Sequence, residues 1–220
     1  MARPRLHDDA LRDRLLQVAA EAVATTGTSG VTVRDVAERA GTSASAVYSL
    51  FGGRAALVRA VGDAAFAGFA AHLAQVPRTD DPHADLLALG LAYREHALTH
   101  PRLYRVMFST SGAGAQDPGR EAATQSRSFA ALEDGVRRVL AHGQDVPAAP
   151  GAREPALGLW ALVHGLVELE LDGLLPGTPA EQAARYTAVL RAAGPAVLAA
   201  GPGPRTAGPG ALSEGRGTVG

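Results

Sequence analysis

Cysteine and lysine are both absent from this chain of 220 residues, and aromatic residues make up only 5% of it. Without cysteine, the chain can form no disulfide and can offer no thiolate as a nucleophile or metal ligand. Without lysine, all 21 basic residues are arginines, which can make bidentate contacts to phosphate or guanine. The net charge of −1 argues against a protein that coats nucleic acid through a general excess of positive charge.

Long apolar runs are missing as well. The longest uncharged apolar stretch, residues 155–167, is much shorter than the roughly 20 residues that a membrane-spanning helix needs. The basic start, residues 1–5, is not followed by an apolar run, so we predict no signal peptide. We therefore expect a soluble, cytoplasmic protein without a membrane partner.

The residues that are present predict an all-α fold. Ala, Leu, Arg and Glu dominate, and no segment alternates apolar and polar residues in the manner of a strand. Apolar spacing and helix breakers predict about nine helices, at residues 6–25, 33–40, 44–50, 54–76, 84–99, 101–108, 120–142, 154–175 and 179–200. We expect an N-terminal domain at 1–53 and a helical bundle at 54–200. The Gly/Pro-rich residues 201–220 are predicted to be a disordered tail.

Residues 31–51 have the layout of a helix-turn-helix. Thr32 is a good N-cap with Asp35 as its capping-box partner, and Gly41 is suited to end the first short helix. Ser43 can cap a second short helix directly after the turn. In such motifs the second helix lies in the DNA major groove and reads base edges. These residues predict that the N-terminal domain binds DNA.

The wider pattern around this motif is more specific than its two helices alone. Residues 8–62 resemble the TetR family of regulators through Ala19, Gly27, VTVRDVA at 31–37, AGTS at 40–43, VY at 47–48, Phe51, Gly53, Arg54 and Leu57. Arg54 is the one departure, because the family commonly has lysine there, but the positive charge is retained. The resemblance implies nine residues at the DNA: Thr32, Arg34, Ser43, Ala44, Ser45, Ala46, Tyr48, Ser49 and Arg54.

The predicted recognition helix has little polar reach. Small side chains at residues 44–46 cannot make bidentate contacts to bases. We therefore expect Arg34, contacts to thymine methyl groups and DNA shape to supply much of the sequence specificity. Three alternatives stay open: Tyr48 and Phe51 could be core residues, Ser45 could be merely solvated, and Arg34 could only pair with Glu38 four residues on.

The C-terminal bundle is strongly apolar, above all in the predicted helix 154–175. In the TetR family the last two long helices pair with their counterparts in a second copy. The resemblance therefore implies a homodimer through helices 154–175 and 179–200, and a palindromic DNA operator. Trp160 and the pair His164-Gly165, with Tyr93 and the segment 100–108, resemble a C-terminal subtype marked by Trp and His-Gly (WHG-type). A hydrogen bond from His164 to Glu168 or to a backbone carbonyl is an alternative role for this histidine.

Bundles of this kind surround an apolar cavity with a few polar groups. Nine residues are candidates to bind a small-molecule effector, which we expect to be apolar or neutral: Phe66, Phe69, Tyr93, His96, Tyr104, Met107, Phe108, Trp160 and His164. Plain core packing is the alternative for each of them. His96 and His100 have a spacing that could bind a metal, but Pro101 ends the helix and no third ligand is near in sequence, so we predict no metal site.

Together these observations predict a ligand-responsive DNA-binding transcriptional regulator, a repressor that a small molecule releases from its operator. The conformational change would pass through helix 54–76, which belongs to both domains. An all-helical enzyme and a helical interaction protein that binds no DNA are the alternatives. The sequence has no glycine-rich phosphate loop, nucleophile elbow or polar carboxylate pair, so we predict no catalytic residues, no enzymatic activity and no cofactor.

Overall fold

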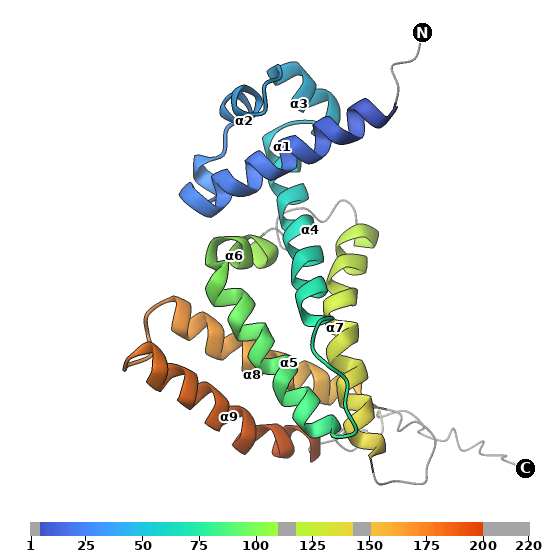
Figure 1. Ribbon diagram of the computed structural model, residues 1–220, viewed down its shortest axis with the longest axis vertical. Coiled ribbons are helices and arrows are strands. Elements are labelled where there is room, and N and C mark those ends of the chain that lie inside the picture. Colours follow the sequence, from blue (N-terminus) through green and yellow to red (C-terminus); the bar gives the residue numbers. More distant parts are fainter. Residues whose placement is uncertain (1–4, 110–117, 143–150, 200–220) are drawn as a thin grey trace, which may run out of the picture.

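The computed structural model describes residues 5–109, 118–142 and 151–199, and the regular secondary structure of these residues consists of helices without strands. The all-α prediction is therefore confirmed, and the helices follow the predicted order (Figure 1). The elements are α1 (Arg5–Thr26), the short 3-10 turn η1 (Thr28–Gly30), α2 (Val33–Arg39), α3 (Ala44–Phe51), α4 (Arg54–Leu73), α5 (Pro82–Thr99), α6 (Pro101–Ser109), α7 (Pro118–Ala141), α8 (Arg153–Leu171) and α9 (Pro179–Ala199). The predicted tail 201–220 lies outside the described residues.

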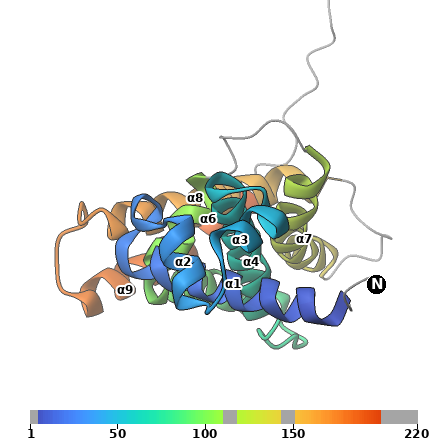
Figure 2. The ribbon, with the colours of Figure 1, turned by 90° about the horizontal axis from the view of Figure 1, so that it is seen from above.

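Helices α1, α2 and α3 form a compact unit at one end of the molecule, and viewed from above they cover α4 and α6 (Figure 2). Their core is made of small and branched apolar residues, with Leu15, Val36 and Val47 completely buried. Leu57 and Val61 of α4 complete this core. Helix α4 therefore starts inside the N-terminal unit, and the domain boundary predicted after residue 53 cuts through a shared core.

The local signals of the helix-turn-helix act as predicted. The Thr32 hydroxyl oxygen accepts a hydrogen bond from the Asp35 amide at 3.1 Å, and the Ser43 hydroxyl oxygen accepts one from the Ala46 amide at 3.3 Å. Gly41 has a φ of +67°, which is the left-handed conformation expected after a helix end. These caps fix the angle between α2 and α3 at which α3 is presented to solvent.

The other helices form the bundle in the lower part of Figure 1, where α4 descends beside α7 and α5 lies between α7 and the α8–α9 pair. Helix α4 is long and apolar enough to cross a membrane by length and composition alone, a test that core helices of soluble proteins also pass. In this structure α4 packs against α1, α6 and α7, with Phe66 and Phe69 buried in the central core.

Two predicted helix ends were wrong. Helix α8 ends at Leu171 instead of residue 175, because Gly173 adopts a φ of +69° and the Leu174 amide donates back to the Leu169 carbonyl at 2.9 Å. The apolar pair Leu174-Leu175 had suggested that the helix continued. Helix α4 ends at Leu73 instead of residue 76, well before the proline that was expected to stop it.

Candidate nucleic-acid interface and internal cavity

Helix α3 has one buried face and one open face. Val47 is completely buried against α1 and α4, whereas residues 43–45, 48 and 49 are exposed and Ala46 is half-buried. The structure gathers most of the predicted DNA contacts on this open face and places Thr32 and Arg34, also exposed, at the start of α2. A short helix held from behind by a rigid apolar core, with small polar residues in front, can enter a major groove.

Tyr48 is the most prominent side chain of this open face, with 58% of its surface exposed. The alternative that Tyr48 is a core residue is therefore wrong, and its hydroxyl is free to reach a phosphate. Its ring lies over Gly53, where an added Cβ would be 3.3 Å from the Tyr48 ring. Phe51, by contrast, is half-buried, and the Arg12 guanidinium lies 5.1 Å from its ring centroid.

Arg34 is exposed, and among the described residues it has no ion pair or hydrogen bond. The alternative pairing with Glu38 is not formed. The neighbouring Arg39 behaves differently, because it contacts Glu21 at 2.9 Å and Asp35 at 3.7 Å. Arg34 is thus a cation on the outer face of the motif that no carboxylate in the described chain neutralises.

Arg54 also has a structural role that was not predicted from the sequence, because its side chain binds backbone carbonyls. Its Nε donates to the Val31 carbonyl at 2.7 Å and its Nη2 donates to the Thr28 carbonyl at 2.5 Å. These bonds tie the start of α4 to the turn between α1 and α2. A lysine ammonium lacks the fork geometry that serves two carbonyls at once, which accounts for an arginine here. Three of its five N–H donors remain for the predicted phosphate contact.

Ser45 is more than a solvated side chain, because its hydroxyl lies 2.8 Å from the Ser43 hydroxyl. Ser43 already accepts from the Ala46 amide, so its own proton can be donated to Ser45. The two serines therefore form a small polar unit at the N-terminus of α3.

The bundle holds a partly open cavity of about 730 Å³ between α4, α5, α6, α7, α8 and α9. Five of the nine predicted effector residues line it: Phe66, Phe69, Tyr93, Phe108 and Trp160. The remaining four, His96, Tyr104, Met107 and His164, do not reach its surface. His96 lies behind Phe69, with ring centroids 5.2 Å apart, and Met107 is completely buried in the core.

Sequence reasoning missed two parts of the cavity wall. The first is Gly90 of α5, where an added Cβ would be 2.8 Å from the end of the Leu190 side chain of α9, so that a larger residue would require this leucine to move. The second is a polar rim formed by Asp81, His83, Glu133, Arg153 and Arg191. These residues come from the start of α5 and from α7, α8 and α9, far apart in sequence, so no local pattern connects them.

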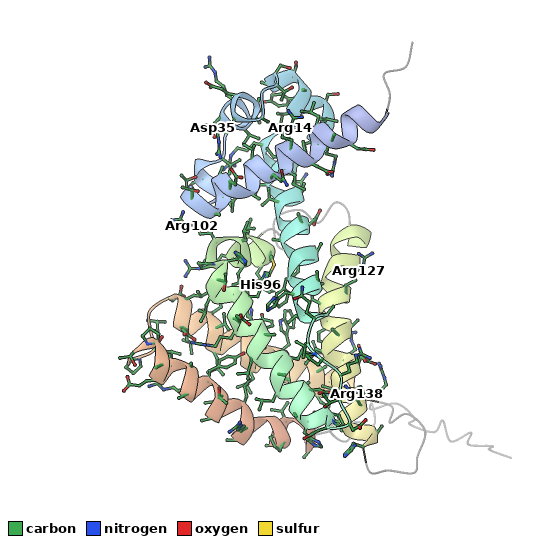
Figure 3. All side chains as sticks on the ribbon, in the orientation of Figure 1. Arg14, Asp35, His96, Arg102, Arg127 and Arg138 are labelled. Atoms are coloured by element: carbon green, nitrogen blue, oxygen red, sulfur yellow. The ribbon has the colours of Figure 1, made fainter. Side chains whose placement is uncertain are left out.

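The rim is held in place by a buried carboxylate near the start of α5. Asp85 accepts hydrogen bonds from the Thr79 hydroxyl at 2.7 Å and from Arg138 of α7 at 2.7 Å. Arg138 also donates to the Thr79 carbonyl at 2.6 Å (Figure 3). The bonds from Thr79, followed by the Arg138 charge, lower the pKa of Asp85 below its usual value. The carboxylate thus fastens the α4–α5 turn to α7.

A cluster of three neutral polar groups lies at the aromatic end of the cavity. The Tyr93 hydroxyl is 2.9 Å from the Tyr104 hydroxyl and 3.1 Å from Nδ1 of His164, and the Tyr104 hydroxyl is 2.7 Å from the same Nδ1. Burial raises the pKa of Tyr93 to about 12, raises that of Tyr104 further and lowers that of His164. Nδ1 of His164 therefore bonds to tyrosines, and within the part of the chain that the structure describes the alternative bond to Glu168 or a backbone carbonyl is not formed.

A chain of histidines lies beside the cavity. The His96 ring is 5.1 Å from His72 and 5.0 Å from His100, measured between centroids, and Figure 3 shows His96 between α4 and α5. Burial, followed by the repulsion of these two neighbours, lowers the pKa of His96 to about 4. Within the described ranges, no three His, Asp or Glu side chains are arranged to bind a metal ion.

Comparisons with known proteins agree on both halves of the chain. Residues 15–61 match the family described as bacterial regulatory proteins, tetR family, and residues 86–193 match the tetracyclin repressor-like C-terminal domain. A search of curated proteins found no match. The second match supports a TetR-type C-terminal domain without distinguishing the WHG-type subtype.

Several solved structures share the fold. A protein with unknown function from Rhodococcus sp. RHA1 is 26% identical with a TM-score of 0.70, covering 86% of this chain and 94% of its own. A transcriptional regulator from the same organism is 22% identical with a TM-score of 0.62, covering 86% and 97%. The TetR family regulator PfmR from Thermus thermophilus is 19% identical with a TM-score of 0.58, covering 85% and 98%.

Proposed function

Because the chain belongs to the TetR family of bacterial transcriptional regulators, we propose that it represses transcription from a palindromic operator and that a small molecule in its cavity releases it. The chain is a DNA-binding regulator and not an enzyme. The observation that supports our proposal best is the exposed face of α3, whose other face packs on the apolar core of the N-terminal unit, at the opposite end of the molecule from α9 (Figure 1). As a protein that acts on DNA, it is proposed to work in the cytoplasm.

The proposal is tested by measuring binding of the whole chain to the DNA upstream of its own gene. Fluorescence anisotropy at several fixed salt concentrations, with unrelated DNA as competitor, separates specific from general binding. We expect one preferred palindromic site. Binding without sequence preference that disappears at moderate salt would contradict the proposal and favour a helical interaction protein that does not regulate through DNA.

Arg34 is proposed as the main specificity residue of this interface. Replacing it (Arg34→Ala) is expected to weaken operator binding by about 1–3 kcal/mol, because an arginine that contacts a base edge makes two hydrogen bonds that alanine cannot replace. Ser45→Ala, which removes one hydroxyl, should cost less. Anisotropy titrations of the variants at one salt concentration measure the difference.

Arg39→Ala is the matched control, since Arg39 is on the same short helix but is already paired with Glu21 and Asp35. It should change operator affinity far less than Arg34→Ala does. Equal affinities for the Arg34→Ala and Ser45→Ala variants would show that α3 itself, and not Arg34, carries the specificity.

We further propose that the chain dimerises through α8 and α9. The support is that α8 and α9 pack against each other and that both keep exposed small or apolar residues, Ala161 and Leu169 on α8 and, at four-residue spacing, Ala184, Ala188 and Ala192 on α9. Small side chains allow helices from two copies to approach closely. A two-fold dimer would present two α3 helices roughly 34–36 Å apart, one turn of DNA.

The WHG-type subtype remains part of this proposal. Trp160 lines the cavity and His164 bonds to the two tyrosines, whereas an added Cβ at Gly165 would have no neighbour within 4 Å among the described residues. A small residue with open space on α8 fits a helix face that contacts a second copy.

We also propose that residues 1–53 bind DNA and that residues 54–200 bind the effector and form the dimer, with α4 contributing to the cores of both parts.

The effector is proposed to be apolar or neutral, and α6 is proposed to transmit its binding together with α4. Arg102 of α6 donates to the Ala24 carbonyl at the end of α1 at 2.8 Å (Figure 3). Leu103 of α6 packs on the N-terminal core, while Phe108, further along the same helix, lines the cavity. A ligand that displaces Phe108 would therefore move α6 against α1 and shift the spacing of the two α3 helices.

A further inference from the structure

The hydroxyl of Tyr93 is a polar group that a ligand can reach at the aromatic end of the cavity. Of the three members of the Tyr93, Tyr104 and His164 cluster, only Tyr93 lines the cavity. Tyr104 is 1% exposed and lies behind it. Around Tyr93 the wall is aromatic, with Phe69 edge-on to its ring at 5.0 Å between centroids. A ligand at this end therefore meets ring faces, the Tyr93 hydroxyl and the indole N–H of Trp160, which itself acts as a hydrogen-bond donor toward the Tyr93 oxygen.

Counting protons shows that the cluster as a whole has hydrogen-bonding capacity that its own members do not use. The three groups make three mutual contacts of 2.7, 2.9 and 3.1 Å. A neutral histidine offers at Nδ1 either one lone pair or one proton, and each tyrosine offers one proton. If Nδ1 of His164 carries a lone pair, the two tyrosine protons can form hydrogen bonds in only two of the three contacts. If Nδ1 carries a proton, that proton and one tyrosine proton use the available contacts, and the proton of the other tyrosine has no acceptor within the cluster. In either tautomer hydrogen-bonding capacity is left over.

The contact between Tyr104 and His164 is the shortest of the three, so it is the one that we expect to persist when a ligand binds. The longest contact joins Tyr93 to His164 at 3.1 Å. A ligand oxygen beside Tyr93 can therefore accept the Tyr93 proton, or donate to the Tyr93 oxygen, while Tyr104 and His164 stay bonded to each other. Tyr93 is the member whose partner can be exchanged at least cost.

The same end of the cavity is unsuited to a negatively charged group. Arg153, the arginine that α8 contributes to the cavity wall, is far from the aromatic end of the cavity. It is seven residues before Trp160, which is about 10 Å along the helix. The Glu168 carboxylate, one turn beyond His164, acts on the hydroxyls of Tyr93 and Tyr104 and makes the local potential negative. A carboxylate placed here would lose its hydration without gaining a cation.

We propose that the cavity takes a neutral, largely apolar ring compound with one hydroxyl or carbonyl oxygen, and that this oxygen hydrogen-bonds to the Tyr93 hydroxyl. This inference rests on the proposed function, because it specifies the effector class of the same cavity. The apolar rings pack among Phe66, Phe108 and Trp160, and the oxygen orients the compound with its polar end away from the arginines of the rim.

Trp160 allows a direct test, because it is the single tryptophan of the chain and it lines the cavity. Three probes of matched shape are titrated while its fluorescence is followed: 4-cyclohexylphenol, cyclohexylbenzene and 4-cyclohexylbenzoate. We expect the phenol to bind about five- to tenfold more tightly than the hydrocarbon, in line with one hydrogen bond. The carboxylate should bind more weakly than both.

Variants locate the bond. Tyr93→Phe should reduce the affinity for the phenol to that for the hydrocarbon and leave the hydrocarbon within about twofold, which also shows that the cavity is intact. Tyr104→Phe removes the same atom from the neighbouring ring that does not line the cavity, so it should preserve most of the advantage of the phenol. Arg153→Ala tests the rim, and the phenol should still bind more tightly than the hydrocarbon in this variant.

Three results would overturn the inference: no binding of the phenol at its solubility limit, an unchanged preference for the phenol in Tyr93→Phe, or tightest binding of the carboxylate with a loss in Arg153→Ala. The last result would place the polar end of the ligand at the rim. Operator binding is measured on the same protein without a probe. If that binding is intact, only the effector class fails; if it is absent, the proposed function itself fails.

Discussion

Replacing Glu170 by alanine is expected to destabilise the protein by about 3–5 kcal/mol, the usual cost of leaving a buried charge without its partner. Arg94 of α5 contacts Glu170 of α8 through two parallel bonds, Nε to Oε2 at 2.7 Å and Nη2 to Oε1 at 2.5 Å. Their side chains are only 15% and 6% exposed. The Arg94 guanidinium also lies 5.6 Å from the Tyr186 ring centroid, so this pair connects α5, α8 and α9.

Thermal unfolding at a fixed protein concentration measures the effect, since dimerisation makes the midpoint depend on concentration. For a chain of this length each kcal/mol lowers the midpoint by roughly 2–4 °C, so we expect a fall of about 10 °C. The control is Glu21→Ala, whose carboxylate is 68% exposed and pairs with Arg39; exposed pairs contribute about 0–1 kcal/mol.

A double variant separates the two causes of such a loss. Arg94→Met with Glu170→Leu removes both charges and keeps most of the volume, so it should recover much of the lost stability. If Glu170→Ala costs no more than Glu21→Ala, the pair is hydrated in solution. If the double variant is as unstable as the single one, packing volume and not charge explains the loss.

The helix-turn-helix could be predicted from sequence almost residue by residue, because its signals are local. A capping hydroxyl, its amide partner three residues on and a glycine in the turn all act within one helix turn, and Thr32, Ser43 and Gly41 occupy the places expected of them. Helix ends without such a signal were less certain. The end of α8 depends on which of two nearby glycines turns the chain, and the apolar residues between them favoured the wrong one.

The cavity could be predicted only in part, because it depends on long-range packing. Aromatic residues on helical spacing mark an interior, but not which ring faces a cavity: Phe69 and Tyr93 line it, whereas Tyr104 and His96 are one layer behind. The hydrogen bonds of Arg54 to two backbone carbonyls could not be predicted for the same reason, because their acceptors are 23 and 26 positions away in the sequence. The described Arg94–Glu170 pair, 76 positions apart, also has no sequence signature.

Placing an arginine on the proposed dimer face is expected to abolish tight operator binding. Ala188 is exposed in the middle of α9, between Ala184 and Ala192, one turn away on either side. If α9 packs against α8 and α9 of a second copy, an Ala188→Arg side chain would meet its own symmetry mate near the two-fold axis. Two guanidinium groups would then lose hydration and repel each other.

The expected result is a monomer at micromolar concentration and operator binding weakened on the order of 100-fold or more, because a single α3 helix lacks the effective concentration that linkage to a second half-site supplies. Light scattering gives the mass, and anisotropy gives the affinity. Ala71→Arg, at an exposed alanine of α4, is the control and should stay dimeric. Ala188 is distant in sequence from α3. If Ala188→Arg loses both the mass of a dimer and its operator affinity, tight DNA binding therefore requires a symmetric pair of chains. A dimer that persists in Ala188→Arg with full affinity would instead place the two-fold axis away from this part of α9.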